Sequence, residues 1–256
     1  MKICRFVHND TIKNGFLKNE FIYPYSDAEV LTAPEVNIEV FDYFKKSEVV
    51  LLPPTRPSKI VCVGRNYTKH AAELGNQVPK EPLLFLKAPS ALIIEGEEIV
   101  LPPQSNRVEH EGELAVIIGR DCRNLKDSDN PLDFVLGYTC LNDVTARDIQ
   151  RSEVQFTRAK SFDTFCPISP FVEIEADVSD VRVTTKVNGI IKQDGRTSEM
   201  VFSVPFLIKY ISRQMSLNAG DVIATGTPSG VSKLNDGDFC EIEIEGIGFL
   251  RNTVKG

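Results

Sequence analysis

The chain has 256 residues, of which 42% are hydrophobic and 25% are charged, and its formal net charge is −7. This length allows a large core, and the composition is ordinary for a globular protein in water. The acidic balance argues against nucleic acid or an anionic membrane surface as a partner. It is still compatible with a small anionic substrate, because a bound cation can override the overall sign of the charge.

Several absences in the sequence indicate a cytoplasmic protein. No apolar stretch approaches the length of a membrane span, and the first residues lack the pattern of a signal peptide. The six cysteines are widely scattered, without a C-x-x-C pair or a histidine at zinc-ligand spacing. We therefore expect reduced and mostly buried thiols instead of disulfides.

The N-terminal part of the chain predicts short strands. Strand-like pieces at 3–7 and 16–25 flank the pair Asn14-Gly15, which is typical of a tight turn between two strands. A short helix is expected near 41–46. We therefore expect mixed α and β structure in this part of the chain.

A proline-rich segment separates two expected domains. Residues 53–57 contain three prolines, which cannot continue a sheet because proline lacks the N–H that pairs the strands. We place the boundary there, with a small N-terminal α+β domain at 1–55 and a main domain at 56–256. The main domain begins with a strand expected at 59–63.

The next segment predicts a short helix at 68–74 that ends at Gly75. His70 and Glu73 are three residues apart, so they share one face of this helix. The more ordinary interpretation is a solvated His-Glu pair on the surface. Glycines at 64 and 75 flank the helix, and such a segment can act as a lid.

Two acidic residues introduce the most informative strand. The run 114–118 is short, apolar and rich in β-branched residues, and therefore predicts a buried strand. Glu111 and Glu113 precede it on one face, where two carboxylates repel each other and lose hydration unless a cation or protons neutralise them. Alternating acids on solvated strands are a common alternative, which we assign to the run 241–245.

A third carboxylate follows a second apolar segment. Asp143 comes after the run 135–141, where residues 145–148 are expected to open a helix. Three acids suit a hard cation such as Mg²⁺ or Mn²⁺ that keeps coordination positions for water and substrate. The alternative for Asp143 alone is the N-cap of that helix.

Further polar side chains follow downstream. Arg147 and Gln150 fall on the first turns of the expected helix, and Lys160 comes soon after as an anion partner or a surface group. The loop 225–230 lacks the ending of a phosphate loop, which makes nucleotide binding improbable. Its small hydroxyl residues and backbone N–H groups fit a carboxylate, and a plain turn is the equal alternative.

Two regular elements complete the chain in its second half. Residues 181–191 predict a hairpin whose two-residue turn is Asn188-Gly189. Apolar residues between 202 and 211 follow helical spacing with Pro205 near the start, and we expect them to belong to the core.

Together, six motifs in one order resemble the fumarylacetoacetate hydrolase family, specifically its small single-copy members that act on acylpyruvates. Each motif alone is weak, and the set spans roughly residue 60 to the C-terminus. The motifs are Gly64-Arg65-Asn66-Tyr67-x-x-His70-x-x-Glu73, His110-Glu111-x-Glu113-Leu114, Asp143-x-Thr145-Ala146-Arg147-Asp148-x-Gln150, Lys160-Ser161-Phe162-Asp163, Val187-Asn188-Gly189 and Thr225-Gly226-Thr227-Pro228-x-Gly230.

The resemblance implies a fold and a set of roles. The fold is α+β and predominantly β, with rolled mixed sheets resembling a sandwich or barrel around a metal-containing pocket, usually in a homodimer. It implies one Mg²⁺ or Mn²⁺ per subunit and a small 2-oxo acid as substrate. The implied residues are Glu111, Glu113 and Asp143 for the metal, His70, Glu73 and Lys160 for catalysis, and Arg65, Arg147, Gln150 and Thr227 for substrate oxygens.

The function that the resemblance implies is hydrolysis of the C–C bond of acylpyruvates, which are 2,4-dioxo acids, to pyruvate and a carboxylic acid. The same metal-enolate chemistry also serves an oxaloacetate decarboxylase or a 2-hydroxymuconate-type isomerase or decarboxylase. Two interpretations from other classes are a non-catalytic metal-binding protein and a β-rich scaffold with solvated acids. Fumarylacetoacetate hydrolases proper have a larger N-terminal domain and a further metal carboxylate, for which this chain shows no counterpart.

Overall fold

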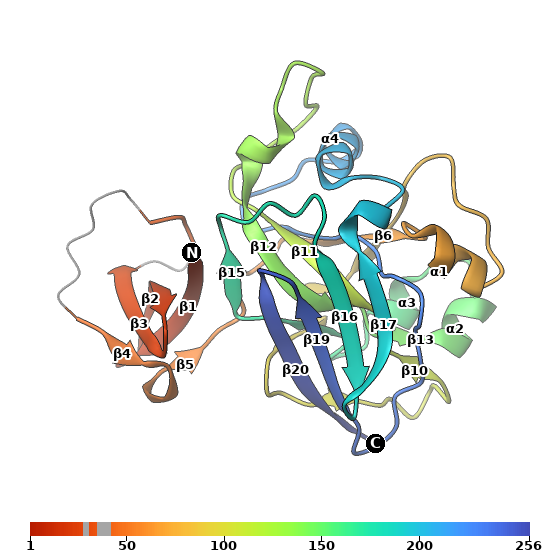
Figure 1. The fold of residues 1–256 in the computed structure, drawn as a ribbon, viewed down its shortest axis with the longest axis horizontal. Coiled ribbons are helices and arrows are strands. Elements are labelled where there is room, and N and C mark those ends of the chain that lie inside the picture. The colour runs from red at the N-terminus through yellow and green to blue at the C-terminus, as the bar shows by residue number, and fades with distance from the viewer. Residues whose placement is uncertain (28–30, 35–41) are drawn as a thin grey trace.

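The protein is built mainly from strands, as a computed structural model of residues 1–27, 31–34 and 42–256 shows (Figure 1). The largest sheet has thirteen strands, both parallel and antiparallel, drawn from both halves of the chain. They are β1 (Lys2–His8), β2 (Thr11–Lys18), β3 (Phe21–Ser26), β4 (Phe44–Lys45), β5 (Val50–Leu51), β6 (Ile60–Gly64), β7 (Leu83–Lys87), β8 (Leu92–Ile94), β11 (Gly112–Ile118), β12 (Val135–Asn142), β14 (Cys166–Ile168), β15 (Phe171–Glu173) and β18 (Val222–Ala224).

A second sheet of five strands packs against the first, and two further strands form a small ladder beside it. The five are β9 (Ile99–Val100), β16 (Arg182–Val187), β17 (Ile190–Arg196), β19 (Phe239–Ile244) and β20 (Gly248–Lys255), and the ladder pairs β10 (Val108–Glu109) with β13 (Thr145–Ala146). The sheets are mixed and stay open. The predicted α+β, predominantly β fold is therefore confirmed, without closure into a barrel.

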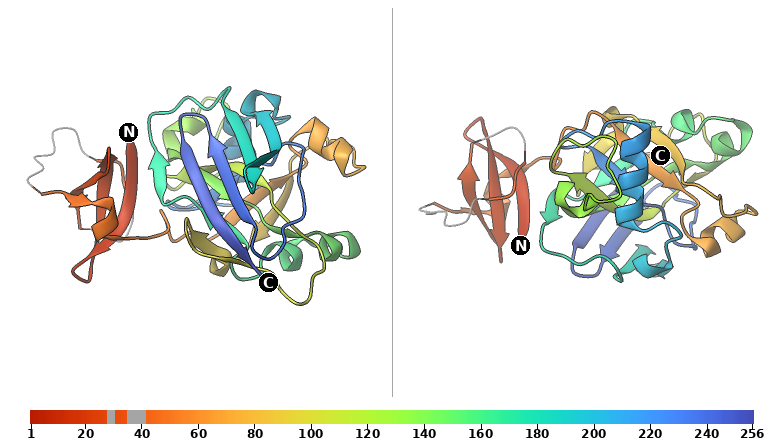
Figure 2. Two further views of the ribbon diagram at one scale, coloured as in Figure 1. Left: turned by 60° about the horizontal axis from the view of Figure 1, so that its bottom comes forward. Right: turned by 90° about the horizontal axis from the view of Figure 1, so that it is seen from above.

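Short helices cover the edges of the sheets. In Figure 2, α1 to α3 lie on the side of the body away from the N-terminal strands. Among the described residues, every helix falls short of the length and hydropathy that a membrane span requires. The α-helices are α1 (Thr68–Glu73), α2 (Arg147–Ser152), α3 (Thr157–Lys160) and α4 (Val204–Gln214), and the 3₁₀ turns are η1 (Lys46–Glu48), η2 (Pro89–Ala91), η3 (Pro131–Phe134) and η4 (Thr197–Glu199).

Strand β11 lies at the centre of the core and is buried on both faces. One face contributes Leu114 and Val116 to a cluster with the second sheet and α4. The other face contributes Ala115 and Ile117 to a cluster with β6 and β18. A continuous apolar run is what a strand covered on both sides requires, so the predicted buried strand is confirmed.

The cysteines behave as the sequence predicts. All six are free and buried. Burial raises the pKa of the Cys140 and Cys166 thiols to about 12. These thiols therefore serve as small apolar residues of the core.

The N-terminal turn prediction was wrong. Asn14 and Gly15 lie inside β2, and the chain turns instead at Asn9-Asp10 and at Asn19, all with positive φ. A Cβ on Gly15 would lie 2.6 Å from the Ile22 side chain, and the pairing of β2 with β3 shifts register beside it. The glycine is there for close packing at a bulge, which a local sequence pattern does not distinguish from a turn.

The helix expected near 41–46 was also wrong where the structure describes it. Phe44 and Lys45 form strand β4, which pairs with β3, and only the short turn η1 follows. The first residue of the expected helix, Phe41, lies outside the described residues. Pairing with a neighbouring strand decided the conformation of this short segment.

The N-terminal strands join the main sheet at its edge. Strand β1 pairs with β15 through Lys2, Ile3 and Cys4. Strands from before and after the proline-rich segment therefore belong to one sheet. In Figure 1 these strands form a distinct group beside the body of the protein. The division into domains 1–55 and 56–256 stays a prediction.

Close packing at the start of β11 generates the first test. A Cβ added to Gly112 would lie 2.2 Å from the Thr185 hydroxyl of β16. We expect Gly112→Ala to lower the free energy of unfolding by about 1–3 kcal/mol, because the two sheets must separate to accept the methyl group. Urea denaturation measures this change. An unchanged midpoint would show that the sheets do not pack this closely.

Candidate active site

Three carboxylates converge where β11 and β12 pair. Glu111 precedes β11, Glu113 lies on it, and Asp143 follows β12, whose last residue pairs with the first of β11. One oxygen of each acid lies within 4.8 Å of the others, and all three side chains are buried. Asp143 donates its backbone N–H to the Glu111 carbonyl at 2.8 Å, which fixes this juxtaposition.

Buried cations already neutralise two of these acids. The Lys160 ammonium donates to Glu111 at 2.8 Å and to Asp143 at 2.6 Å. Burial lowers the pKa of Lys160, but the two carboxylates outweigh it and raise the pKa overall. Lys87, which the sequence analysis did not single out, donates to the other oxygen of Asp143 at 2.7 Å.

Glu113 is the acid that no cation contacts among the described residues. Its carboxylate accepts one hydrogen bond, from the Gly226 backbone N–H at 2.8 Å. Burial and the nearby charges of Asp143 and Glu111 raise its pKa well above the ordinary value. A carboxylate in this position binds a proton or a metal ion, and three hard oxygen donors suit Mg²⁺ or Mn²⁺. The residues therefore fit the implied ion.

Arg147 stands at the centre of a buried ion-pair network. Its guanidinium donates to Glu109 at 2.7 Å, to Glu111, and to the side-chain oxygen of Gln150. Glu109 also accepts from Arg107 at 2.6 Å. Burial opposes ionisation of Glu109, yet the two arginines lower its pKa overall. Glu109, missed in the sequence analysis, holds Arg147 in one orientation at the first turn of α2.

The helix α2 begins later than expected. The short strand β13 occupies Thr145–Ala146, and α2 starts at Arg147. Asp143 is therefore separated from the helix by this strand and does not form its N-cap. Pairing of β13 with β10 accounts for the difference.

The loop 225–230 holds carboxylates of the protein itself. Besides the contact of Gly226 with Glu113, the Gly230 N–H donates to the Glu73 carboxylate at 3.0 Å. Thr227 donates its hydroxyl to the Gly112 carbonyl at 2.8 Å. The loop thus holds the Glu113 and Glu73 side chains in place, in line with the prediction that its N–H groups suit a carboxylate.

A buried glutamine joins this loop to strand β11. Gln193 accepts from the Gly112 N–H at 2.9 Å and donates to the Thr227 hydroxyl at 2.6 Å. It also contacts the His110 ring at 3.1 Å. The local sequence pattern does not indicate this role, because Gln193 stands in a polar stretch that is typical of a solvated hairpin strand.

Helix α1 places a histidine over the site. The His70 Nδ1 lies 3.3 Å from the Glu73 carboxylate, and the imidazole is buried. Burial is the largest influence on His70 and lowers its pKa, so the neutral, basic form is favoured. The helix spans Thr68–Glu73, and Gly75 follows with φ of 71°. The predicted helix and its glycine end are therefore confirmed.

The predicted residues share one small cavity of about 30 Å³. That volume holds roughly two waters, or an ion and a water. Of the ten predicted residues, only Glu73 is not in its wall; Glu73 lies behind His70. The predicted residues that line it are Arg65, His70, Glu111, Glu113, Asp143, Arg147, Gln150, Lys160 and Thr227.

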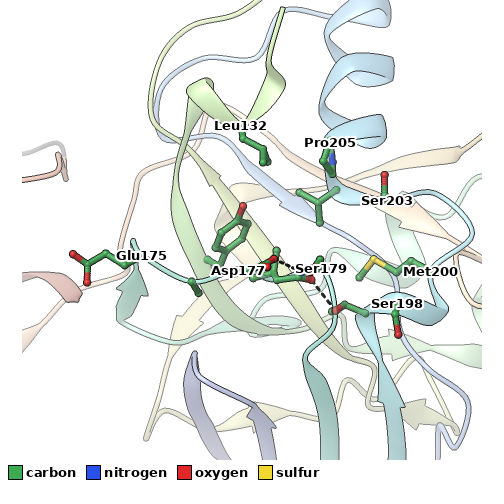
Figure 3. A pocket seen from close by; sticks show the side chains of 13 residues that line it. Leu132, Glu175, Asp177, Ser179, Ser198, Met200, Ser203 and Pro205 are labelled. Atoms are coloured by element: carbon green, nitrogen blue, oxygen red, sulfur yellow. Dashed lines mark hydrogen bonds between the residues drawn. The ribbon is translucent and has the colours of Figure 1, made fainter.

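A larger cavity of about 700 Å³ lies elsewhere, between the start of α4 and the segment 175–179 (Figure 3). Its wall combines apolar side chains such as Leu132 and Met200 with hydroxyl groups and the acids Glu175 and Asp177. No lysine, arginine or histidine is among its described lining residues. These lining residues therefore include neither the cationic side chains nor the histidine that line the small cavity.

The uncompensated Glu113 generates a test with two readouts. We expect Glu113→Gln to lower the affinity for Mn²⁺ by at least about 100-fold, because it removes a charged ligand. The stability of the metal-free protein should not fall, since the amide is a neutral group of nearly the same shape and lacks the charge whose repulsion raises the pKa of Glu113. Calorimetric titration and urea denaturation measure the two effects. Glu243→Gln, on the half-solvated strand β19, is the control and should change neither the Mn²⁺ affinity nor the stability. Unaltered Mn²⁺ affinity in Glu113→Gln would refute the metal assignment.

Comparison with known proteins places this arrangement in a family. The family model described as fumarylacetoacetate (FAA) hydrolase C-terminal matches residues 59–255. An uncharacterized protein of Archaeoglobus fulgidus is 50% identical over 251 residues, which cover 97% of this chain and 94% of that protein. Oxaloacetate tautomerase YisK of Bacillus subtilis is 39% identical over 241 residues, covering 89% of this chain and 80% of the relative.

A solved structure agrees along the whole chain. The X-ray structure of 5-carboxymethyl-2-hydroxymuconate delta-isomerase from Mycobacterium smegmatis matches with a TM-score of 0.88 at 37% identity, covering 100% of this chain and 99% of that one. Sequence, fold and family model thus lead to one assignment. The chain belongs to the fumarylacetoacetate hydrolase family.

Proposed function

We propose that the protein is a divalent-metal-dependent enzyme that forms and protonates the enolate of a small 2-oxo acid, with keto–enol tautomerisation of oxaloacetate as its reaction. The observation that carries the proposal is the convergence of Glu111, Glu113 and Asp143, where no cation contacts Glu113 within the part of the chain that the structure describes. These three acids would hold one Mg²⁺ or Mn²⁺ per subunit. The ion would polarise the 2-oxo group of the substrate as a Lewis acid.

The charge of the site supports an anionic substrate. Three buried cations, Lys87, Lys160 and Arg147, face the three acids. The ion would therefore add positive charge to a cluster that is close to balanced. A carboxylate of the substrate, and the negative charge that develops on the enolate, would offset it.

His70 is the proposed acid and base. Its lowered pKa keeps the imidazole neutral near pH 7, and Glu73 orients the ring through Nδ1, which leaves Nε2 to accept a proton. In the tautomerisation, His70 would take a proton from C3 of oxaloacetate, and a proton would be added at the 2-oxo oxygen. The net change is the movement of one hydrogen within the substrate.

The remaining predicted residues would bind and stabilise the substrate. Lys160, fully buried and charged, would lie beside the developing enolate. Arg147, Gln150 and Thr227 would contact substrate oxygens, and each is already held by neighbouring groups, which favours a fixed geometry. Arg65 would act at the outer side of the cavity.

Two observations favour tautomerisation over the other reactions of this chemistry. The Bacillus subtilis relative carries the name oxaloacetate tautomerase, and the Mycobacterium smegmatis structure is that of an isomerase. Both names describe an isomerisation, in which a hydrogen moves within the molecule and no C–C bond is broken. Decarboxylation of oxaloacetate would instead break the C3–C4 bond and leave CO₂ and the enolate of pyruvate, and it is a side reaction in this proposal.

A second candidate is hydrolysis of acylpyruvates, which the His70–Glu73 contact supports. In that reaction His70 would take a proton from water, the hydroxide would attack the 4-oxo carbon, and the C3–C4 bond would break. The products are a carboxylic acid and pyruvate enolate, which then takes up a proton.

A homodimer and the absence of nucleic-acid or membrane partners stay predictions, as does a cytoplasmic location. A non-catalytic metal-binding protein is the interpretation that the assays below exclude.

The metal dependence of both candidates is tested with one preparation. We expect the protein with Mg²⁺ or Mn²⁺ to accelerate the decay of enol oxaloacetate, followed by its ultraviolet absorbance, and to lose this activity after exhaustive chelation. Acetylpyruvate cleavage, followed as released pyruvate, is measured in parallel. Faster turnover of acetylpyruvate would favour the hydrolase, and full activity without metal would refute the proposal.

The histidine assignment is tested by substitution. We expect His70→Ala to reduce kcat at least about 100-fold, because general acid–base catalysis contributes that much or more. Mn²⁺ affinity should stay near the wild-type value, since the three acids are intact. His8→Ala, on strand β1, removes another histidine outside the site and should retain activity. Undiminished turnover in His70→Ala would remove His70 from the mechanism.

A further inference from the structure

A glutamine of the second sheet holds a side chain that lines the small cavity. Gln193 lies on β17, is fully buried, and uses both ends of its side-chain amide. Its oxygen accepts from the Gly112 N–H at 2.9 Å. Its nitrogen donates to the Thr227 hydroxyl at 2.6 Å and to the Pro228 carbonyl at 2.7 Å. Of these partners, Thr227 is the one whose side chain lines the small cavity.

The two ends of this amide cannot exchange places. A backbone N–H can only donate and a carbonyl can only accept, so the oxygen must face Gly112 and the nitrogen must face Pro228. The Thr227 hydroxyl therefore accepts from Gln193, and it gives its own hydrogen to the Gly112 carbonyl at 2.8 Å. Two hydrogen bonds thus fix the Thr227 oxygen in the cavity wall.

A bulge in β17 directs the glutamine toward this wall. Thr185 on β16 pairs with Gln193, but the next residue, Lys186, pairs with Ile191, so Lys192 is an extra residue directly before the glutamine. A bulge of this kind changes the direction of the side chains beside it and is common next to active sites.

Two glycines bring β17 into direct contact with the loop 225–230. A Cβ on Gly195 would lie 2.6 Å from the Pro228 side chain, and a Cβ on Gly230 would collide with the Lys192 carbonyl. No side chain separates the strand from the loop at these points. The distance between Gln193 and Thr227 is therefore set by the packing of one backbone on the other.

We propose that Gln193 is a positioning residue of the active site, which acts on the substrate through the Thr227 hydroxyl. This inference rests on the proposed function, which places Thr227 against a substrate oxygen. Without the amide, the Thr227 side chain could adopt another rotamer, and the substrate would lose a fixed hydrogen-bond partner. The second sheet would thereby contribute to substrate binding, although none of its described strands lines the small cavity.

A double-mutant cycle tests the role, with oxalate as the probe. Oxalate has two adjacent oxygens in one plane, as the enolate of a 2-oxo acid does. We expect Gln193→Met to weaken oxalate binding to the Mn²⁺-loaded protein about tenfold by calorimetric titration, because one hydrogen-bond partner is lost. The loss should be as large in Thr227→Ser, which retains the hydroxyl, and less than about twofold in Thr227→Val, which lacks it. An undiminished loss in Thr227→Val would show that Gln193 acts through Gly112 or the fold, and would overturn the proposal.

Thr185→Val is the matched control. Thr185 is buried directly opposite Gln193, and its hydroxyl has no hydrogen-bond partner within the part of the chain that the structure describes. The substitution should leave oxalate binding within about twofold, and a tenfold loss there would attribute the effect to packing and overturn the proposal. If Gln193→Met does not fold, Gln193→Glu replaces it in the cycle, because it keeps the acceptor for Gly112 and removes the donor to Thr227.

Turnover in the same preparations separates this role from the proposed function. We expect kcat/KM for oxaloacetate to follow the same pattern across the variants. The expected cycle with oxalate but no turnover of oxaloacetate or acetylpyruvate would overturn the proposed function and leave the positioning role standing. Turnover that Gln193→Met does not alter, with oxalate binding also unaltered, would overturn the positioning role alone. Neither oxalate binding nor turnover in the wild type would overturn both.

Discussion

The burial of three like charges is the constraint around which this protein is built. Glu111, Glu113 and Asp143 lose their hydration together, and each raises the energy of ionising the next. Lys87 and Lys160 offset part of this free-energy cost, because each donates a hydrogen bond to a different oxygen of Asp143. The remaining repulsion falls on Glu113, which no cation contacts among the described residues, and a further cation would relieve it.

Rigid surroundings keep the acids from moving apart. The pairing of β11 with β12 fixes the backbone at the site. Gly112 allows the second sheet to approach without an intervening side chain, and Gln193 occupies the space behind it with all of its polar atoms engaged. In such close packing, rotation of a carboxylate toward solvent would open a void or break hydrogen bonds. The repulsion is therefore retained in the folded state instead of being relaxed.

The sequence predicted the elements whose signal is local. Strand β11, helix α1 with Gly75, and the Asn188-Gly189 hairpin were all found where the pattern placed them. The alternation of acids in β19 also proved to be a half-solvated strand. Helix α4 was predicted as well, yet its Phe206 is 48% exposed, because the apolar spacing continues past the face that packs on the core.

The parts that the sequence did not predict depend on distant partners. Lys87 and Glu109 look like ordinary charged residues until the fold brings Asp143 and Arg147 to them. Gly15 resembles a turn residue, and only the side chain of Ile22 shows why glycine is needed there. Motif resemblance identified nine lining residues of the small cavity because it carries information about the assembled site. Periodicity and spacing alone supplied the acids and the histidine as candidates.

One loop gives the site a mechanical property that neither the acids nor the helix has by itself. Residues 225–230 contact Glu113 through one backbone N–H and Glu73, on α1, through another. A displacement of α1 would therefore move the same short segment that orients Glu113. If Glu113 holds an ion, the position of α1 and the binding of that ion would each alter the free energy of the other.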